Sequence, residues 1–458
     1  MIMTVAQVFD AQQNFFNSNS TKDISWRLKQ LSKLENLLKQ NEEMLYEAIK
    51  DDFEKSQFET YVTELSFIYS EIAYSKKHLR SWAKRKRVAT GLANFPARSY
   101  IIPEPLGTCL VIGAWNYPYQ LSLLPAVAAL AAGNTVIIKP SEMPARTAAA
   151  MAQIINSNFD PKILYVAEGA VEMTTELLKL KFDKIFFTGS TAVGKIIYKA
   201  AAENLVPVTL ELGGKSPTFV FADADIAVSA QRIVWAKFLN AGQTCVAPDF
   251  IMVEKSIEQK FLNVLKEEIE KRYSNIQVTD DHYLQIINDK NFKRLTGLID
   301  QSKVFYGGQT NSENRFIAPT IMQNVSFEDK VMEEEIFGPI LPVITFDSVE
   351  EAISKVKAQP KPLSLYIYSK SSKTIDKLLN ELSFGSGAVN DSLMQLSNHH
   401  LPFGGVGNSG MGSYHGKTSF DNFSHFKSIL HKPFWFESSM KYAPYTDMKL
   451  KLVKWIMG

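Results

Sequence analysis

Apolar side chains recur at helical spacing through residues 5–85 of the chain. In the clearest stretch they stand among charged neighbours, at Trp26, Leu28, Leu31, Leu34, Leu37 and Leu38. This spacing predicts helices that have one apolar face. Because such a face must be buried, we expect these helices to cover another part of the protein.

Beyond Gly107 the chain alternates short apolar runs with helical segments. The runs predict strands at 108–113, 135–139, 163–166 and 184–188. A helix is predicted over 121–132, and the next one starts at Pro140-Ser141-Glu142, with Ser141 as its N-cap. Strands that alternate with helices predict an α/β fold with a parallel, doubly wound sheet.

A second α/β region is predicted from 213 to about 418, with strands at 218–220, 250–253 and 363–368. The chain closes on a stretch, 433–458, that mixes aromatic residues with lysines. Its residues 449–457 predict a basic amphipathic helix, which either packs on the protein surface or makes weak contact with a membrane.

Composition excludes several classes of protein. The 458 residues suffice for roughly two or three domains, and a 45% hydrophobic share is typical of a globular protein. A formal net charge of +2 gives no support to nucleic acid as a partner. We see no apolar stretch of the ~20 residues that a membrane-spanning helix needs. Residues 1–10 lack signal-peptide character, and two separated cysteines make no disulfide framework, so we expect a cytoplasmic protein.

The carboxyl ends of the predicted strands mark a candidate nucleotide site. Ligands of doubly wound sheets lie at this edge, which places Ile112, Trp115, Lys139 and the turn 189–194 around one crevice. Glycines in the turn would let the backbone approach a pyrophosphate, and the following helix offers free N–H groups. The spacing is not G-x-G-x-x-G, so the glycines equally fit a steric role in the turn.

Cys245 is the candidate nucleophile, because it lies in a polar loop, 240–248, whereas Cys109 lies in an apolar run. Glu211 ends an apolar run against two glycines, where a carboxylate is costly to bury without a task. The amide of Asn116 could donate to an oxyanion. Taken singly, Glu211 also fits an ion pair and Asn116 a turn.

Seven short motifs follow one another along the chain: Trp115-Asn116-Tyr117-Pro118, Lys139-Pro140-Ser141-Glu142, Phe187-Thr188-Gly189-Ser190, Leu210-Glu211-Leu212-Gly213-Gly214-Lys215-Ser216-Pro217, Gly242-Gln243-Thr244-Cys245, Glu335-Ile336-Phe337-Gly338-Pro339 and Leu401-Pro402-Phe403-Gly404-Gly405. Together they resemble the aldehyde dehydrogenase superfamily, and more closely its short class 3 branch, from about residue 10 to residue 432. The resemblance implies a Rossmann-type cofactor domain, an α/β catalytic domain and a small oligomerisation flap.

The activity that the resemblance implies is NAD(P)-dependent oxidation of aldehydes to carboxylic acids. Cys245 would attack the aldehyde, and Asn116 with the Cys245 backbone N–H would hold the oxyanion. Glu211 would then activate the water that hydrolyses the thioester.

The resemblance also implies a set of cofactor-binding residues: Ile112, Trp115, Lys139, Glu142, Gly189, Ser190, Val193, Gly194, Leu212, Glu335, Phe337 and Phe403. Lys139 and Glu142 correspond to residues at the adenosine ribose, Glu335 to one at the nicotinamide ribose, and Phe337 and Phe403 to residues beside the nicotinamide. A carboxylate at Glu142 favours NAD, while NADP stays usable. We assign no metal site.

By position in the same family, an apolar aldehyde channel is implied, lined by Phe67, Tyr117, Trp235 and Leu239. It suits medium-chain aliphatic or aromatic aldehydes. Phe67 and Leu239 equally fit a role in the core.

The domains implied are an NAD(P)-binding domain at 1–82 and 103–212, a catalytic domain at 213–418, an oligomerisation element at 83–102 and 419–432, and a C-terminal tail at 433–458. Class 3 relatives form dimers through such an element, so a homodimer is expected.

Three rival functions differ from this reading. A CoA-acylating semialdehyde dehydrogenase uses the same thioester but commonly lacks the glutamate at the position of Glu211. A structural or binding protein could reuse the fold without catalysis. A cysteine protease needs a histidine base, and the seven histidines have no recognisable protease context.

Overall fold

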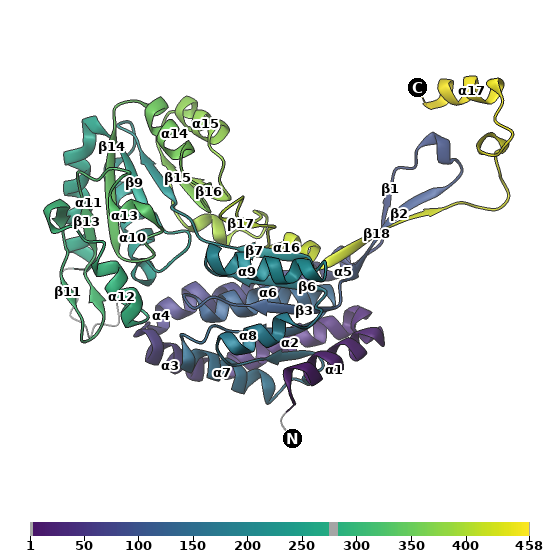
Figure 1. Ribbon diagram of the computed structural model, residues 1–458, viewed down its shortest axis with the longest axis horizontal. Coiled ribbons are helices and arrows are strands. Elements are labelled where there is room, and N and C mark those ends of the chain that lie inside the picture. The colour runs from purple at the N-terminus through teal and green to yellow at the C-terminus, as the bar shows by residue number, and fades with distance from the viewer. Residues whose placement is uncertain (1–2, 274–282, 458) are drawn as a thin grey trace.

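The computed structural model describes residues 3–273 and 283–457, which form two large β-sheets covered by helices and a smaller sheet that projects from them (Figure 1). Residues 1–2 and 458, at the ends of the predicted first domain and tail, lie outside the described residues. Residues 274–282 of the predicted catalytic domain do so as well.

The first large sheet has the strand order β17-β7-β6-β3-β4-β5. Its strands are β3 (Thr108–Ile112), β4 (Thr135–Lys139), β5 (Leu164–Val166), β6 (Lys184–Thr188), β7 (Val208–Glu211) and β17 (Gly410–Met411). All neighbours are parallel except β17, which pairs antiparallel with β7. The order reverses between β3 and β6, so the predicted doubly wound sheet is confirmed, and its ligand crevice belongs at the carboxyl ends of these two strands.

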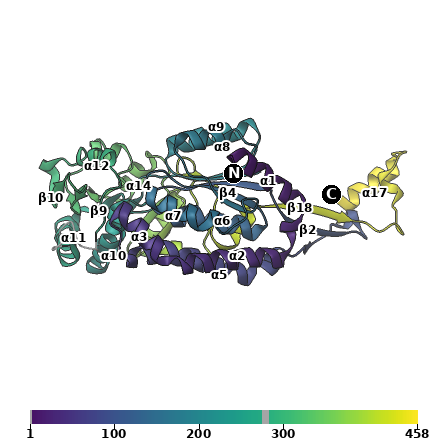
Figure 2. The same ribbon diagram turned by 90° about the horizontal axis from the view of Figure 1, so that it is seen from below.

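Helices cover both faces of this sheet, as the view in Figure 2 makes clear. Cys109 and Val111 of β3 pack toward one face, and Leu110 and Ile112 pack toward the other, because successive side chains of a strand alternate. The helices of this region are α1 (Val5–Asn17), α2 (Ile24–Gln40), α3 (Glu42–Phe53), α4 (Gln57–Thr60), α5 (Ser66–Trp82), α6 (Pro118–Ala132), α7 (Ala145–Asn156), α8 (Val171–Leu178) and α9 (Thr191–Glu203), with a π-helical turn over Tyr61–Leu65. The helical character predicted for 5–85 is therefore confirmed.

The start of α7 corrects one prediction. Ser141 does not cap this helix, which begins four residues later at Ala145. The Ser141 hydroxyl instead accepts the N–H of Met143 within a turn. The cap comes from another helix, since the Asp52 carboxylate accepts the backbone N–H groups of Arg146 and Thr147 at 3.3 and 2.8 Å. A distant carboxylate can satisfy free N–H groups as well as a local hydroxyl does.

The second large sheet has the order β10-β13-β14-β9-β8-β15-β16 and is parallel except for β10. Its strands are β8 (Pro217–Val220), β9 (Phe250–Glu254), β10 (Val304–Tyr306), β13 (Thr320–Met322), β14 (Ile340–Phe346), β15 (Ser364–Tyr368) and β16 (Ser386–Val389), and a ribbon of β11 (Thr310–Asn311) and β12 (Phe316–Ile317) lies nearby in sequence. Its helices are α10 (Ile226–Phe238), α11 (Glu258–Tyr273), α12 (Asp289–Thr296), α13 (Lys330–Glu333), α14 (Val349–Lys357) and α15 (Ser372–Glu381). The predicted strands at 218–220, 250–253 and 363–368 fall on β8, β9 and β15.

The third sheet is antiparallel and joins β1 (Lys86–Val88), β2 (Arg98–Pro105) and β18 (Ser424–His431). Together with α17 (Asp447–Met457) it projects from the rest of the molecule (Figure 1). Of the ranges predicted for the oligomerisation element, 83–102 contains β1 and the start of β2, and 419–432 contains the end of a helix followed by β18. Short 3-10 turns lie at Ser20–Lys22, Leu92–Asn94, Leu239–Gly242, Lys255–Ile257, Gln301–Lys303, Met394–Ser397 and Ser439–Lys441.

The chain leaves the second region earlier than the predicted boundary at 418. Gly410 of β17 already pairs with Glu211 of β7, and the helix α16 (Gly416–Asn422) packs beside α6. This return brings a segment from the end of the chain to the carboxyl end of β7. Among residues 3–273 and 283–457, no helix is long and apolar enough to cross a membrane.

Candidate active site

Cys245 follows a sharp left-handed turn that ends α10. Asn240, Ala241 and Gly242 have φ angles of 54°, 50° and 72°, a conformation that side chains other than asparagine and glycine rarely adopt. A Cβ at position 242 would lie 2.3 Å from the carbonyl oxygen of Gly338, so glycine is required there. We call residues 240–245 the nucleophile loop; this turn sets where it presents the thiol of Cys245.

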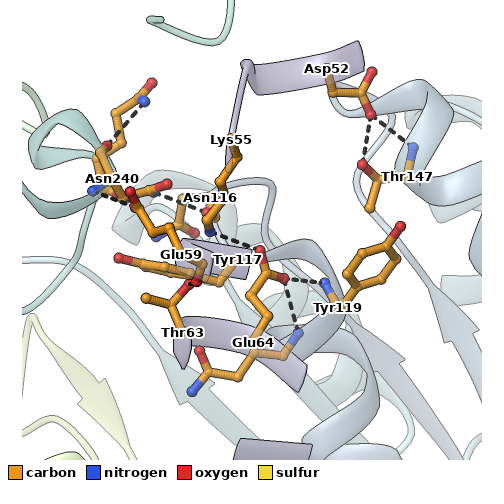
Figure 3. A network of polar contacts seen from close by, with 12 residues as sticks. Asp52, Lys55, Glu59, Thr63, Glu64, Asn116, Tyr117, Tyr119, Thr147 and Asn240 are labelled. Atoms are coloured by element: carbon orange, nitrogen blue, oxygen red, sulfur yellow. Dashed lines mark hydrogen bonds and ion pairs between the residues drawn. The ribbon is translucent and has the colours of Figure 1, made fainter. Parts of the chain in front are cut away.

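Asn116 lies against the nucleophile loop (Figure 3). Its side-chain amide donates to the carbonyl of Gln243 at 3.0 Å, and the Asn240 amide donates to the carbonyl of Asn116 at 3.0 Å. Asn116 is buried, with 3% of its surface exposed. Its amide has two N–H groups, so one stays available for a ligand. Two segments 127 residues apart are thus joined at the candidate oxyanion site.

Glu211 ends β7 and is buried, with 3% exposure. Neither carboxylate oxygen has a hydrogen-bond partner among the described residues. Burial raises the pKa of this carboxyl well above its ordinary value. An unpaired buried carboxylate is costly for a fold and is typical of a group that exchanges protons.

Cys245 shares its surroundings with two carboxyl groups. Burial raises the pKa of the Cys245 thiol to about 12, and the nearby charges of Glu335 and Glu211 add to the rise. Burial also raises the pKa of Glu335 to about 8, with a further rise from Asp249. The structure therefore brings Cys245, Glu211 and Glu335 into one electrostatic group.

Glu335 is held close to the main chain. A Cβ at Gly213 would come within 1.9 Å of its Oε2 atom, so position 213 must be glycine for Glu335 to lie there. The loop is fixed from the other side, because Asp249 accepts the Ile336 N–H at 2.9 Å and pairs with Lys215 at 2.5 Å. Among the predicted cofactor residues, Glu335 is thus rigidly placed.

Phe337 and Phe403, the two aromatic residues predicted beside the nicotinamide, pack against different neighbours. Phe337 has a left-handed φ of 52°, and its ring meets that of Trp115 edge to face at 5.3 Å. Phe403 is buried, pairs through its backbone with Tyr414, and stacks on His415 at 5.4 Å. A left-handed phenylalanine is strained and is found where a site over-determines the backbone.

Lys139 ends β4 and is buried, whereas the side chain of Glu142 is 44% exposed. Their charged groups lie 3.6 Å apart, and the Lys139 ammonium donates to the carbonyl of Pro140 at 2.6 Å. Burial lowers the pKa of Lys139, and the charge of Glu142 opposes that shift. The pair lies at the carboxyl end of β4, where Lys139 is the pairing partner of Ile112 on the neighbouring strand β3.

The turn after β6 combines a cap with close packing. The Ser190 hydroxyl accepts the Val193 N–H as N-cap of α9. A Cβ at Gly194 would lie 2.6 Å from the Leu212 side chain, so this glycine has the steric role. The Thr188 hydroxyl, at the strand end, is buried without a partner among the described residues. Free N–H groups beside an unpaired hydroxyl fit a phosphate-bearing cofactor.

The predicted channel residues differ in exposure. Tyr117 is buried, and its hydroxyl lies 2.6 Å from that of Thr244, which precedes Cys245. Trp235 is 36% exposed, and Leu239 is half-buried beside the left-handed turn. Phe67 lines a cavity of about 210 Å³, which also holds the polar side chains of Glu71, His399 and His415.

Three charged residues at the site escaped the sequence analysis: Lys55, Glu59 and Glu64. They lie within residues 5–85, where the spacing of apolar residues predicts only which face of each helix is buried. A buried Lys–Glu pair leaves no local signal, because its partners are chosen by the tertiary structure.

Comparison with known proteins agrees with this geometry. A family model described as "Aldehyde dehydrogenase family" matches residues 3–429. The chain is 47% identical to 4,4'-diaponeurosporen-aldehyde dehydrogenase of Staphylococcus aureus (98% of each chain covered) and 43% identical to the dimeric NADP-preferring aldehyde dehydrogenase of Canis lupus familiaris (95% of this chain, 96% of that one).

A solved structure, described as the substrate-bound state of Staphylococcus aureus AldH, superposes with a TM-score of 0.97 at 45% identity over the whole of both chains. Sequence motifs, fold and relatives therefore agree. The chain belongs to the aldehyde dehydrogenase family and is an NAD(P)-dependent oxidoreductase of aldehydes.

Proposed function

We propose that the protein oxidises aldehydes through a covalent thioester on Cys245. The thiol gives its proton to water, and the thiolate attacks the aldehyde carbonyl, forming a carbon–sulfur bond as the carbonyl double bond opens to an oxyanion. Asn116, with the Cys245 backbone N–H, holds the resulting oxyanion. Bound NAD(P) would supply the hydride acceptor that converts this adduct into an acyl group on the Cys245 sulfur. Glu211 then takes a proton from the water that releases the acid.

The observation that carries this proposal is the state of Glu211. Its two oxygens are buried beside Cys245 with no hydrogen-bond partner in the part of the chain that the structure describes, and its pKa is raised. A carboxyl group whose pKa is raised accepts a proton more readily than an ordinary one, which suits Glu211 to take a proton from water. Its presence also argues against the CoA-acylating alternative, in which a thiol and not water releases the acyl group.

NAD(P) would be held by the residues named above at the carboxyl ends of β3, β4 and β6, with Glu335 at the other end of the crevice. We propose that NAD is preferred and NADP accepted. Support comes from the Glu142 carboxylate, which would repel a 2′-phosphate, and from Lys139, which offsets that charge at 3.6 Å. The canine relative carries the opposite preference in its name.

Medium-chain aliphatic or aromatic aldehydes are the proposed substrates, on the strength of Phe67, Tyr117, Trp235 and Leu239. A channel with aromatic walls gains from an apolar aldehyde body. The Staphylococcus aureus relative is named for 4,4'-diaponeurosporen-aldehyde, so this compound belongs in any substrate panel.

We propose a homodimer formed through the projecting sheet. Its outer strands β1 and β18 each leave one edge unpaired in the described chain, and it exposes Leu92, Phe95 and Leu430 at 75%, 62% and 52%. Apolar surface of this kind marks an interface.

Weak membrane contact of the tail stays a prediction, which rests on exposed Met448 and Trp455 beside the lysines of α17.

A cytoplasmic location is proposed because the mechanism needs a free thiol at Cys245. Both cysteines are unpaired, and Cys109 is buried in β3, where it cannot reach a partner. A reducing compartment keeps such a thiol available.

The test is an assay of NAD(P) reduction with short, long and aromatic aldehydes, without and with CoA. We expect turnover without CoA, and we expect Cys245→Ala to abolish it while NADH still binds. Turnover that requires CoA would support the acylating alternative. Normal turnover in Cys245→Ala would overturn the nucleophile assignment.

A further inference from the structure

One short segment, residues 55–64, contacts both loops that carry the proposed chemistry (Figure 3). It comprises the link after α3, the helix α4 and most of the π-helical turn. Its charged residues Lys55 and Glu64 are 1% and 0% exposed, and Glu59 is partly buried. No step proposed above uses any of them.

Glu59 binds the nucleophile loop directly. Its carboxylate accepts the backbone N–H of Asn240 at 2.8 Å, across 181 residues of sequence. Asn240 is the first residue of the left-handed turn that leads to Cys245. A charged acceptor on that N–H stabilises a backbone conformation that is otherwise unfavourable.

Glu64 binds the other loop. Its Oε2 atom accepts the backbone N–H groups of Tyr119 and Gln120 at 2.8 and 3.4 Å, in the first turn of α6. These groups have no partner within their own helix, and a carboxylate at a helix N-terminus is favoured by the helix dipole. The start of α6 lies two residues after Asn116, so Glu64 anchors the strand-to-helix loop that presents the Asn116 amide.

Lys55 lies between the two carboxylates. Its ammonium pairs with Glu64 at 2.9 Å and stands 4.5 Å over the ring of Tyr117. Burial raises the pKa of Glu59, and both the charge of Lys55 and the Asn240 N–H oppose that rise. Lys55 thus places a positive charge beside both carboxylates.

The π-helical turn explains how two glutamates five residues apart act together. In a regular α-helix their side chains would point about 140° apart. Here the N–H of Ser66 bonds to the carbonyl of Tyr61, an i→i+5 bond that widens the turn. The wider turn lets Glu59 and Glu64 approach the same cation, and π-bulges of this kind are frequent at functional sites.

We propose that Glu59 is a positioning residue, which holds the nucleophile loop through the Asn240 N–H, while Lys55 and Glu64 tie that loop to the one bearing Asn116. The inference rests on the proposed function of Cys245 and Asn116. Glu59 touches neither substrate nor cofactor in this scheme. It sets the distance between the nucleophile and the oxyanion donor.

Two readouts test the role of Glu59: the rate of the first-turnover burst of NADH with an aldehyde, and the rate at which iodoacetamide alkylates Cys245. Glu59→Ala removes the acceptor and should slow both by about tenfold or more, because a small misplacement of reacting groups is costly. NADH affinity should not change. Glu59→Gln keeps an oxygen acceptor and should stay within about threefold of the wild type in both rates.

Asp183→Ala is the matched control. Asp183 also accepts a backbone N–H, that of Thr108 at 2.8 Å, but at the amino end of β3, away from the site. This variant should lower Tm and leave both rates unchanged. Should Glu59→Ala fail to fold, Glu59→Asp, which withdraws the carboxylate by one methylene, should show the same slowing.

The proposal is overturned if Glu59→Ala or Glu59→Asp keeps wild-type rates, or if Glu59→Gln is as impaired as Glu59→Ala. It is also overturned if Asp183→Ala slows both rates as much. The two proposals fail separately, because alkylation needs no aldehyde. If the wild type reduces NAD(P) with none of the aldehydes tested, the proposed function is refuted. Slowed alkylation of Glu59→Ala would still support the positioning role.

Discussion

The side-chain amide of Asn116 donates a 3.0 Å hydrogen bond to the carbonyl of Gln243, two residues before Cys245. This contact joins the proposed oxyanion donor to the loop of the proposed nucleophile. It ties the position of one to that of the other, since both segments are buried and hydrogen-bonded.

Asn116→Ala removes the amide and should slow hydride transfer by ~10²-fold or more, because an oxyanion donor acts in the transition state. The measurement is the burst rate of NADH at saturating aldehyde. Asn116→Asp, an acceptor of similar size, is the comparison and should not restore the rate. An unchanged rate in Asn116→Ala would show that Asn116 serves only the turn.

Glu211→Gln should separate the two halves of the reaction. Thioester formation does not need a water activated by this carboxyl group, whereas hydrolysis does. We expect a normal burst of NADH followed by slow turnover, in contrast to Cys245→Ala, which should show no burst. Loss of the burst in Glu211→Gln would mean that Glu211 acts earlier, on the thiol.

The reactivity of Cys245 should rise with pH. Its pKa is raised to about 12, chiefly by burial, so the thiol is protonated below that value and only the thiolate is nucleophilic. Alkylation of the cofactor-free protein by iodoacetamide should therefore rise about tenfold per unit between pH 7 and 9.

Glu335→Gln removes one of the charges that raise this pKa and should increase the alkylation rate at pH 9, where Glu335, with a pKa of about 8, is ionised. A rate that is flat above pH 7 in the wild type would contradict a raised thiol pKa.

Glu142→Gln should raise the kcat/KM for NADP relative to that for NAD, because it removes a negative charge at the proposed adenosine ribose site. The effect should shrink as salt screens the half-exposed side chain. Glu351→Gln, which removes a surface charge paired with Lys355, is the control. If the ratio does not move, Glu142 does not select the cofactor.

The sequence by itself determined the α/β class and the positions of most strands in the two large sheets. Parallel strands buried on both faces read as short apolar runs, as 135–139 and 184–188 do, so their place is visible without a structure. The motifs around Asn116, Glu211 and Cys245 likewise identified the family, since they are local in sequence.

Only the tertiary structure decided which groups meet. Glu59 and Asn240, 181 residues apart, carry no local signal of their contact. The cap of α7 comes from Asp52 and not from Ser141, and β17 returns to β7 from the far end of the chain. Burial patterns follow from the period of an element, but a hydrogen-bond acceptor can come from anywhere in the chain, so its identity depends on the packing of the whole fold.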